Sequence, residues 1–165
     1  MMQQQIGNDP TGAIFSPCRT YRYLLWRIWD TKKPLVLFIG LNPSTADETK
    51  DDPTIRRVQQ SAKDWKFGGV YMMNLFAYRT PYPSELFQCS NPIGENDYWL
   101  QLIAPQCSEV IFAWGSSKGA QTRAAKVIPF FPNAKALVLN KDGSPRHPLY
   151  VRAGVEPVPF IQKEI

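Results

Sequence analysis

Residues 35–44 read LVLFIGLNPS, seven almost entirely apolar residues that give way abruptly to turn-forming ones. A short run of this kind is typical of a strand that is buried on both faces, as in the middle of a parallel sheet. The run stops at Gly40-Leu41-Asn42-Pro43, where asparagine and proline favour a turn. The stretch therefore predicts a central strand over residues 35–41, with covering layers on both sides of the sheet.

The rest of the chain alternates between predicted strands and predicted helices. Further apolar runs that read as strands occupy residues 70–74 (VYMMN), 109–114 (EVIFAW) and 134–139 (AKALVL). Helical spacing of apolar residues is found after Asp52, within residues 91–107 and over residues 117–130. Strands separated by helices imply right-handed crossovers and a parallel sheet. We expect one α/β domain over residues 1–165, a three-layer α/β/α sandwich with a central four-stranded, mainly parallel sheet.

The first helix has the clearest start signal. Asp52 precedes Pro53, and an aspartate caps a helix well while proline is tolerated at the first helical position. Ile55, Val58 and Ala62 then fall on one helical face. Gly68-Gly69 is expected to end the element.

Two outer segments are less regular. Residues 21–29 are rich in aromatic side chains and precede a plausible turn at residues 31–34. We expect an antiparallel hairpin there, with a short helix as the alternative. Prolines interrupt residues 145–159, so this segment is expected to be loop with short extended pieces.

The composition excludes several classes of protein. Of the 165 residues 44% are hydrophobic, which is enough to fill a core. No apolar run approaches the ~20 residues that cross a bilayer, and residues 1–9 lack the apolar stretch of a secretory signal. Three widely spaced cysteines and a single histidine are too few for a structural zinc or iron–sulfur site. We expect a cytoplasmic protein without metal, iron–sulfur cluster, cofactor or membrane partner.

The charge gives a hint about partners. The formal net charge is +5 and the sequence pI is about 9.2. A pI above ~9 is typical of nucleic-acid binders, because neutralised phosphates supply most of their non-specific affinity. The basic residues are dispersed along the chain, so a mildly basic enzyme with scattered surface charge is an equal alternative. DNA or a nucleotide is the expected partner.

Small, polar or cationic residues follow each predicted parallel strand. Because ligands bind beyond the carboxyl ends of the strands in such sheets, these are candidate site residues. They are Asn42, Pro43, Ser44 and Asp47 after the first strand, Asn74 and Arg79 around the second, Gly115 and Ser116 after the third, and Arg146 and His147 after the fourth.

Three of these residues carry the clearest chemistry. The amide of Asn42 can hold a water or a substrate oxygen, although Asn–Pro is also an ordinary turn. Asn74 follows four apolar residues, and its amide has the donor and acceptor that match the Watson–Crick edge of a pyrimidine. His147, the only histidine, lies between Arg146 and Pro148 and is a poor candidate for the core. A plain surface histidine is the alternative.

A second set of residues suggests a phosphate-binding site. Ser44 and nearby backbone N–H groups can bind an anion, and the paired Arg56 and Arg57 can clamp a phosphate. The acids Asp51 and Asp52 in front of these arginines are explained as favourable charges at a helix N-terminus.

The order of these motifs resembles the uracil-DNA glycosylase superfamily. The matching motifs are GLNPS at 40–44, Asn74 at the end of an apolar strand, FAWGS at 112–116 and HPL at 147–149. Over nearly its full length the chain is also similar to domain-of-unknown-function family 1643. The residues that carry this likeness are FSPC at 15–18, 40–47, DPTIRR at 52–57, NLFAYR at 74–79, AWG at 113–115 and GSPRHPLY at 143–150.

The glycosylase resemblance implies an α/β/α sandwich that hydrolyses the N-glycosidic bond of a modified or damaged base in DNA. It implies that Asn42 holds the attacking water, that Asn74 reads the base edge and that His147 donates to the base oxygen. Because Asn42 is not a carboxylate, slow chemistry is expected, and Asp47 is the candidate to supply a carboxylate.

The same resemblance implies contacts around the base. Phe76 and Tyr78 are the candidates to stack on it, and Leu149 or Tyr150 would fill the gap that an extruded nucleotide leaves in a duplex. The superfamily's H-P-S-P loop reads HPLY here, which leaves the course of its backbone open.

Three functions are therefore compatible with the sequence. The first is a DNA base-excision glycosylase. The second is an enzyme of the same fold that acts on a free nucleoside or nucleotide. The third is a noncatalytic nucleic-acid-binding module that kept the pocket.

Overall fold

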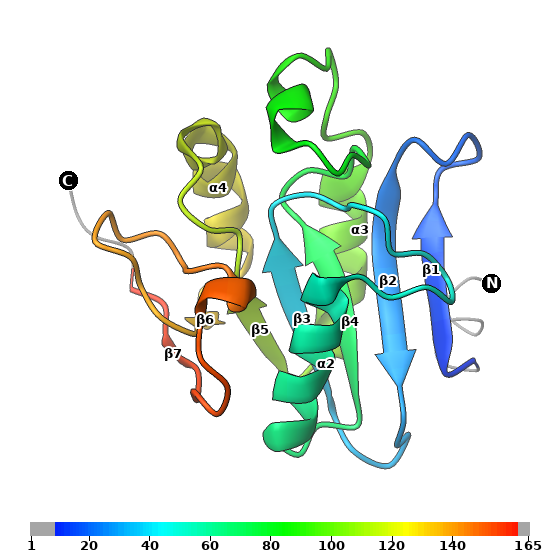
Figure 1. The fold of residues 1–165 in the computed structure, drawn as a ribbon, viewed down its shortest axis with the longest axis vertical. Coiled ribbons are helices and arrows are strands. Elements are labelled where there is room, and N and C mark those ends of the chain that lie inside the picture. Colours follow the sequence, from blue (N-terminus) through cyan, green and yellow to red (C-terminus); the bar gives the residue numbers. More distant parts are fainter. Residues whose placement is uncertain (1–8, 162–165) are drawn as a thin grey trace.

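A computed structural model describes residues 9–161, so residues 1–8, on which the prediction of no secretory signal rests, lie outside it. The described chain forms one seven-stranded mixed sheet in the order β1-β2-β4-β3-β5-β6-β7 (Figure 1). The strands are β1 Thr11–Phe15, β2 Arg22–Ile28, β3 Leu35–Gly40, β4 Gly69–Asn74, β5 Glu109–Phe112, β6 Lys135–Ala136 and β7 Val158–Pro159. Strands β4, β3, β5 and β6 are parallel neighbours, whereas β1, β2 and β7 pair antiparallel.

Three α-helices cover the two faces of this sheet within the described residues: α2 Pro53–Asp64, α3 Asn96–Ile103 and α4 Gln121–Val127. Helix α2 packs on one face, where Ile55 and Val58 share a core with Val36 and Phe38 of β3. Helices α3 and α4 pack on the other face, in a second core that contains Leu37 of β3. Alternate residues of β3 thus point into two different cores, which explains why residues 35–39 are uniformly apolar.

The start of α2 confirms its sequence signal. Oδ1 of Asp52 accepts a hydrogen bond from the backbone N–H of Ile55 at 2.9 Å, and Pro53 is the first helical residue. The helix ends before Gly68, because the chain turns at Lys66 with a φ of 68°.

The expected sheet was too small, and one pairing was wrong. The segment at 21–29 does form a strand, but β2 lies between β1 and β4 and does not pair with β3. The turn at 31–34 therefore joins two strands that β4 separates and does not close the antiparallel hairpin that was expected there; β2 is instead antiparallel to β1 and β4. The last parallel strand is short because the chain folds back on itself: Leu139 bridges Pro145, and Val138 accepts a hydrogen bond from Arg146.

Two predicted helices are also shorter than expected. The segment 91–107 contains α3 and a short 3₁₀ turn, Ala104–Gln106, in which Pro105 lies. The segment 117–130 divides into a 3₁₀ turn, α4 and a second turn, Ile128–Phe130, that contains Pro129. Proline lacks the N–H that a continuing helix needs, so both helices end ahead of one. None of the described helices is long and apolar enough to cross a membrane.

The order of the strands creates a crevice at the middle of the sheet. From β3 the chain passes through α2 on one face to β4, and from β4 it passes through α3 on the opposite face to β5, on the other side of β3 (Figure 1). After β3 the chain enters α2 on one face, whereas after β5 it enters α4 on the other face. The segments that follow β3 and β5 therefore leave toward opposite faces. Ligands of open α/β sheets bind at such a point, beyond the carboxyl ends of the strands.

Candidate functional site

A cavity of about 190 Å³ opens at this point of the sheet. It is smaller than the ~300–1,000 Å³ clefts that hold drug-sized ligands, so it suits one ring-sized group. Its lining comes from six regions of the chain: Arg22 of β2; Gly40, Leu41, Asn42 and Ser44 at and after the end of β3; Asp52, Thr54 and Ile55 at the start of α2; Met72, Asn74, Thr80, Pro81 and Pro83 on and after β4; Trp114 after β5; and His147. The structure thus brings Asn42, Asn74 and His147 together in one cavity.

Asn74 is the most constrained of these three residues. It is paired in register with Gly40 at the ends of β4 and β3, and only 3% of its surface is exposed. A Cβ on Gly40 would lie 2.8 Å from Oδ1 of Asn74, so the glycine makes room for this amide. The Nδ2 of Asn74 is buried without a hydrogen-bond partner in the described chain. An unpaired buried amide costs free energy, which a ligand with an acceptor would repay.

Asn42 is fixed by the loop that follows β4. Its Nδ2 donates to the backbone oxygens of Thr80 at 2.8 Å and Pro43 at 3.0 Å. The backbone N–H of Thr80 also donates to the oxygen of Pro43, so the two loops are tied together. Because the amide nitrogen is engaged, the oxygen Oδ1 is the group that Asn42 offers to a ligand or a water.

His147 is held in one tautomer by its own loop. The backbone N–H of Leu149 donates to Nδ1 at 3.2 Å, so in the neutral ring the proton is on Nε2. Burial lowers the pKa of His147 below its usual range, and the negative charge of Asp52 offsets part of this effect. The residue is therefore a neutral hydrogen-bond donor at pH 7.

Two hydrogen bonds to backbone oxygens place this loop over the cavity. The N–H of Gly115 donates to the oxygen of Pro145 at 2.8 Å, which attaches the loop to the end of β5. Gly115 has a φ of 82°, a conformation that glycine adopts without strain. On the other side, the guanidinium of Arg57 donates to the oxygen of Val151 and so ties the segment after His147 to α2.

The cavity also contains a buried cation. Arg22 is 3% exposed, and of its guanidinium nitrogens only Nη1 donates to a described acceptor, the oxygen of Ala46 at 3.1 Å. Its Nε has no partner. Burial lowers the pKa of Arg22 to about 10, while the charge of Asp52 acts in the opposite direction. Arg22 forms no ion pair with any residue between 9 and 161.

A second cavity of about 310 Å³ lies beside the first and shares Trp114 with it. Gly115 and Ser116 line this second cavity, with residues of α4 and of the segment 142–145. These two predicted site residues are thus adjacent to the cavity of Asn42, not part of it.

Five further predicted residues lie outside the first cavity. The carboxylate of Asp47 accepts the backbone N–H groups of Thr49 and Lys50 and so stabilises its own loop. Phe76 is buried in the core against Phe87, and Tyr78 bridges Tyr21 at the edge of the sheet. Arg79 donates to the backbone oxygens of Ser44 and Thr45 and so holds the loop whose Ser44 lines the cavity. Pro43 is buried next to Asn42.

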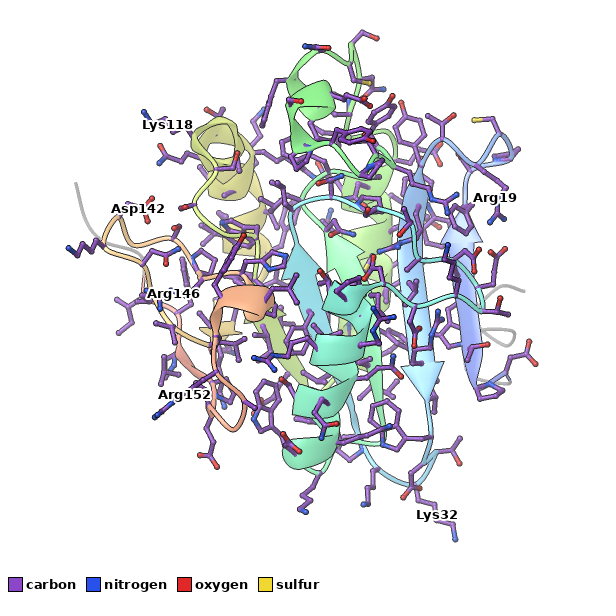
Figure 2. The ribbon with its side chains drawn as sticks, viewed as in Figure 1. Arg19, Lys32, Lys118, Asp142, Arg146 and Arg152 are labelled. Carbon is purple, nitrogen blue, oxygen red and sulfur yellow. The ribbon has the colours of Figure 1, made fainter. Side chains whose placement is uncertain are left out.

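The remaining predicted residues are on the outside. Arg56 is exposed on α2, and Arg146 donates to Oδ1 of Asn140. Leu149 and Tyr150 are exposed, Tyr150 by 80%, on the short turn after His147. Figure 2 shows Arg146 and Arg152 on one side of the molecule and Arg19 and Lys32 elsewhere, so these charges do not form one patch. Of the three predicted phosphate ligands, only Ser44 lines the first cavity.

Sequence reasoning missed Arg22, Asp52 as a wall of the cavity, Thr54 and Thr80. Arg22 had a visible signal, because a cation inside an otherwise aromatic strand segment needs a reason to be there. Thr54 and Asp52 follow from the position of α2, whose N-terminus faces the cavity. Over residues 9–161, no three His, Cys, Asp or Glu side chains gather in a way that could hold a metal ion.

Comparison with known proteins places this site in a family. Residues 22–149 match the family described as "Protein of unknown function (DUF1643)", and this match spans the cavity from Arg22 to His147. Searches of curated proteins and of solved structures gave no match. Since the match covers more than half of the chain, the protein belongs to the DUF1643 family.

Proposed function

We propose that this protein is a uracil-DNA glycosylase-like enzyme that hydrolyses the N-glycosidic bond of a modified or damaged base in DNA. One observation carries the proposal: Asn42, Asn74 and His147, distant in sequence, line one ring-sized cavity at the carboxyl edge of the sheet. These are the positions at which the sequence resembles the water-binding, base-reading and base-oxygen-binding residues of that superfamily. The sandwich architecture fits the same reading.

The proposed reaction adds water across the glycosidic bond. The water oxygen bonds to C1′ of the sugar, the C1′–N bond breaks, and its electron pair leaves with the base. One proton of the water ends on the released base nitrogen or in solvent. As negative charge develops on the base, the Nε2–H of His147 donates to the base oxygen, which stabilises the transition state more than the ground state.

Asn42 and Asn74 position the two reactants. Oδ1 of Asn42 accepts a hydrogen bond from the attacking water, since its Nδ2 is already engaged by backbone oxygens. The amide of Asn74 pairs with the edge of the base, and this contact satisfies the otherwise unpaired Nδ2. Buried groups that pair only with the correct base discriminate strongly against bases that lack the partner.

Asp52 replaces Asp47 as the candidate general base. Asp47 is engaged by its own loop, whereas Asp52 lines the cavity. Oδ1 of Asp52 caps α2, and the second oxygen, Oδ2, is the one we assign to accepting a proton from the water.

The test is abasic-site formation on oligonucleotides that carry uracil or one of a panel of modified bases. Wild-type protein is expected to release one base, and Asn42→Ala to release none while remaining folded. Asn74→Asp is expected to change which base is released. Lys63→Gln, an exposed change on α2, is the control and should match wild type. Absence of base release from every oligonucleotide, or unchanged release by Asn42→Ala, would contradict the proposal.

A free nucleoside or nucleotide is the second candidate substrate. The observation that favours it is the placement of charge: a cation lies inside the cavity, while Figure 2 shows the labelled cations on several sides of the molecule. The same assay with free nucleosides and nucleotides distinguishes the two. Binding of DNA with a steep salt dependence and no turnover on either substrate would indicate the noncatalytic module.

A further inference from the structure

Arg22 is buried without an ion pair to any residue between 9 and 161, although the charge of Asp52 in the same cavity acts on it. Burying a cation is costly unless it is paired and hydrogen-bonded. The second arginine of the same strand shows how the fold treats a structural cation. Arg27 pairs with Asp51 at 2.9 Å and donates to the backbone oxygens of Trp26, Asp47, Glu48 and Lys50. Arg22 has one such contact and an unpaired Nε.

The surroundings of Arg22 favour an anion. The cavity that Arg22 lines also contains Asp52, which caps the 12-residue helix α2, and Thr54 and Ile55 of its first turn. The N-terminus of a helix carries partial positive charge and attracts anions. Asp52 is the carboxylate that opposes this effect, but its Oδ1 is engaged with the N–H of Ile55 and it forms no ion pair with Arg22.

We propose that Arg22 forms an anion subsite in the cavity and that the substrate is a nucleobase compound with a negatively charged group, a carboxylate or a phosphate, which Arg22 binds. The nucleobase part of this proposal rests on the proposed function, whereas the anion subsite rests on Arg22 itself. The planar guanidinium donates from Nε and Nη2 to two oxygens of the anion, a geometry that carboxylate and phosphate both match. His147 and Asn74 remain free to contact the ring.

The test measures stabilisation by inorganic phosphate, since a ligand that binds only the folded state raises the melting temperature. Wild type, Arg22→Met and Lys63→Gln are titrated with sodium phosphate, against sodium chloride at equal ionic strength. Wild type and Lys63→Gln are expected to show the same saturable rise in Tm, and Arg22→Met none. Lys63→Gln removes the same unit of charge from the exposed side of α2, so it controls for net charge.

Arg22→Lys keeps the proposal testable if Arg22→Met does not fold. Lysine retains the charge but loses the two-pronged geometry, so phosphate affinity is expected to fall about tenfold or more. The proposal is overturned if phosphate does no more for wild type than chloride does. It is also overturned if the variant at position 22 that folds binds phosphate as tightly as wild type.

Two further comparisons identify which part of the substrate carries the anion. Uridine 5′-monophosphate carries its charge on the sugar side and is compared with uridine, whereas orotate carries a carboxylate on the ring and is compared with uracil. A gain in affinity that depends on Arg22 for either charged member supports the subsite and names its source. No gain in either pair overturns it. Because these measurements need no turnover, their failure and a failure to release bases from DNA are separate results.

Discussion

His147 accepts a hydrogen bond at Nδ1 and has a lowered pKa, and the lowered pKa has a consequence for stability. Its folded-state pKa lies below the ordinary histidine value because the ring is partly buried. Between the folded pKa and the unfolded value, about 6.5, the unfolded chain binds more protons than the folded one. The free energy of unfolding must therefore fall as the pH decreases through this window.

We expect wild type to lose stability between pH 7 and pH 5 relative to His147→Gln, whose side chain does not titrate. Urea denaturation at several pH values measures this difference. Parallel dependence of the two proteins on pH would show that the imidazole is not buried as described. If the ring stabilises developing negative charge, the same variant should lower the rate of base release by about 10²–10³.

Gly40 is the residue that makes space for the amide of Asn74, which we propose reads the base. An added Cβ would meet Cε of Met72 at 2.7 Å and Oδ1 of Asn74 at 2.8 Å. We expect Gly40→Ala to displace Asn74, with loss of base release and a destabilisation of about 1–3 kcal/mol from overpacking. Urea unfolding and the abasic-site assay measure the two effects. Normal turnover in this variant would show that the position of Asn74 is not critical.

Helix α2 combines a structural role and a proposed catalytic one in Asp52. Loss of the cap in Asp52→Ala is expected to cost about 1 kcal/mol, whereas Asn caps helices as well as Asp does. Asp52→Asn should therefore keep the stability of wild type and yet lose most of its base release, because an amide cannot accept the proton of the water. If Asp52→Asn remains fully active, Asp52 is a cap and nothing more.

Strand β2 holds the loop at residues 46–51 through Arg27. Removing this buried partner takes the ion pair from Asp51 and one donor each from the backbone oxygens of Asp47 and Lys50. We expect Arg27→Met to destabilise the fold by about 3–5 kcal/mol, the usual cost of breaking a buried pair. Arg22→Met should cost much less, because burial already disfavours the charge of Arg22. Chemical denaturation of both variants gives the comparison, and equal losses would contradict the distinction between the two arginines.

At the scale of the whole molecule, local signals were informative and long-range pairing was not. The apolar run at 35–41 and the Asp52-Pro53 start of α2 are local patterns, and both are confirmed. The position of β2 beside β4 depends on contacts between distant segments, which no local pattern encodes. For the same reason residues 134–139 read as one strand, although the chain after Ala136 pairs with its own return segment.

The candidate site divides in the same way. The rule that ligands bind beyond the carboxyl ends of strands is enough to find Asn42, Asn74 and His147. The rule fails for Arg22, because β2 runs antiparallel to its neighbour β4 and brings its first residue, not its last, to this edge. The rule also predicts Gly115 and Ser116 as residues of this site, but they line the neighbouring cavity.

The central claim concerns one imidazole, and the chain contains a single histidine, so ¹⁵N spectra of labelled protein report on His147 alone. At pH 7 we predict a neutral ring with its proton on Nε2, and a change in the Nε2 signal when a free nucleobase such as uracil is added. A proton on Nδ1, or an Nε2 signal that saturating nucleobase leaves unchanged, would contradict a base-binding role for this cavity.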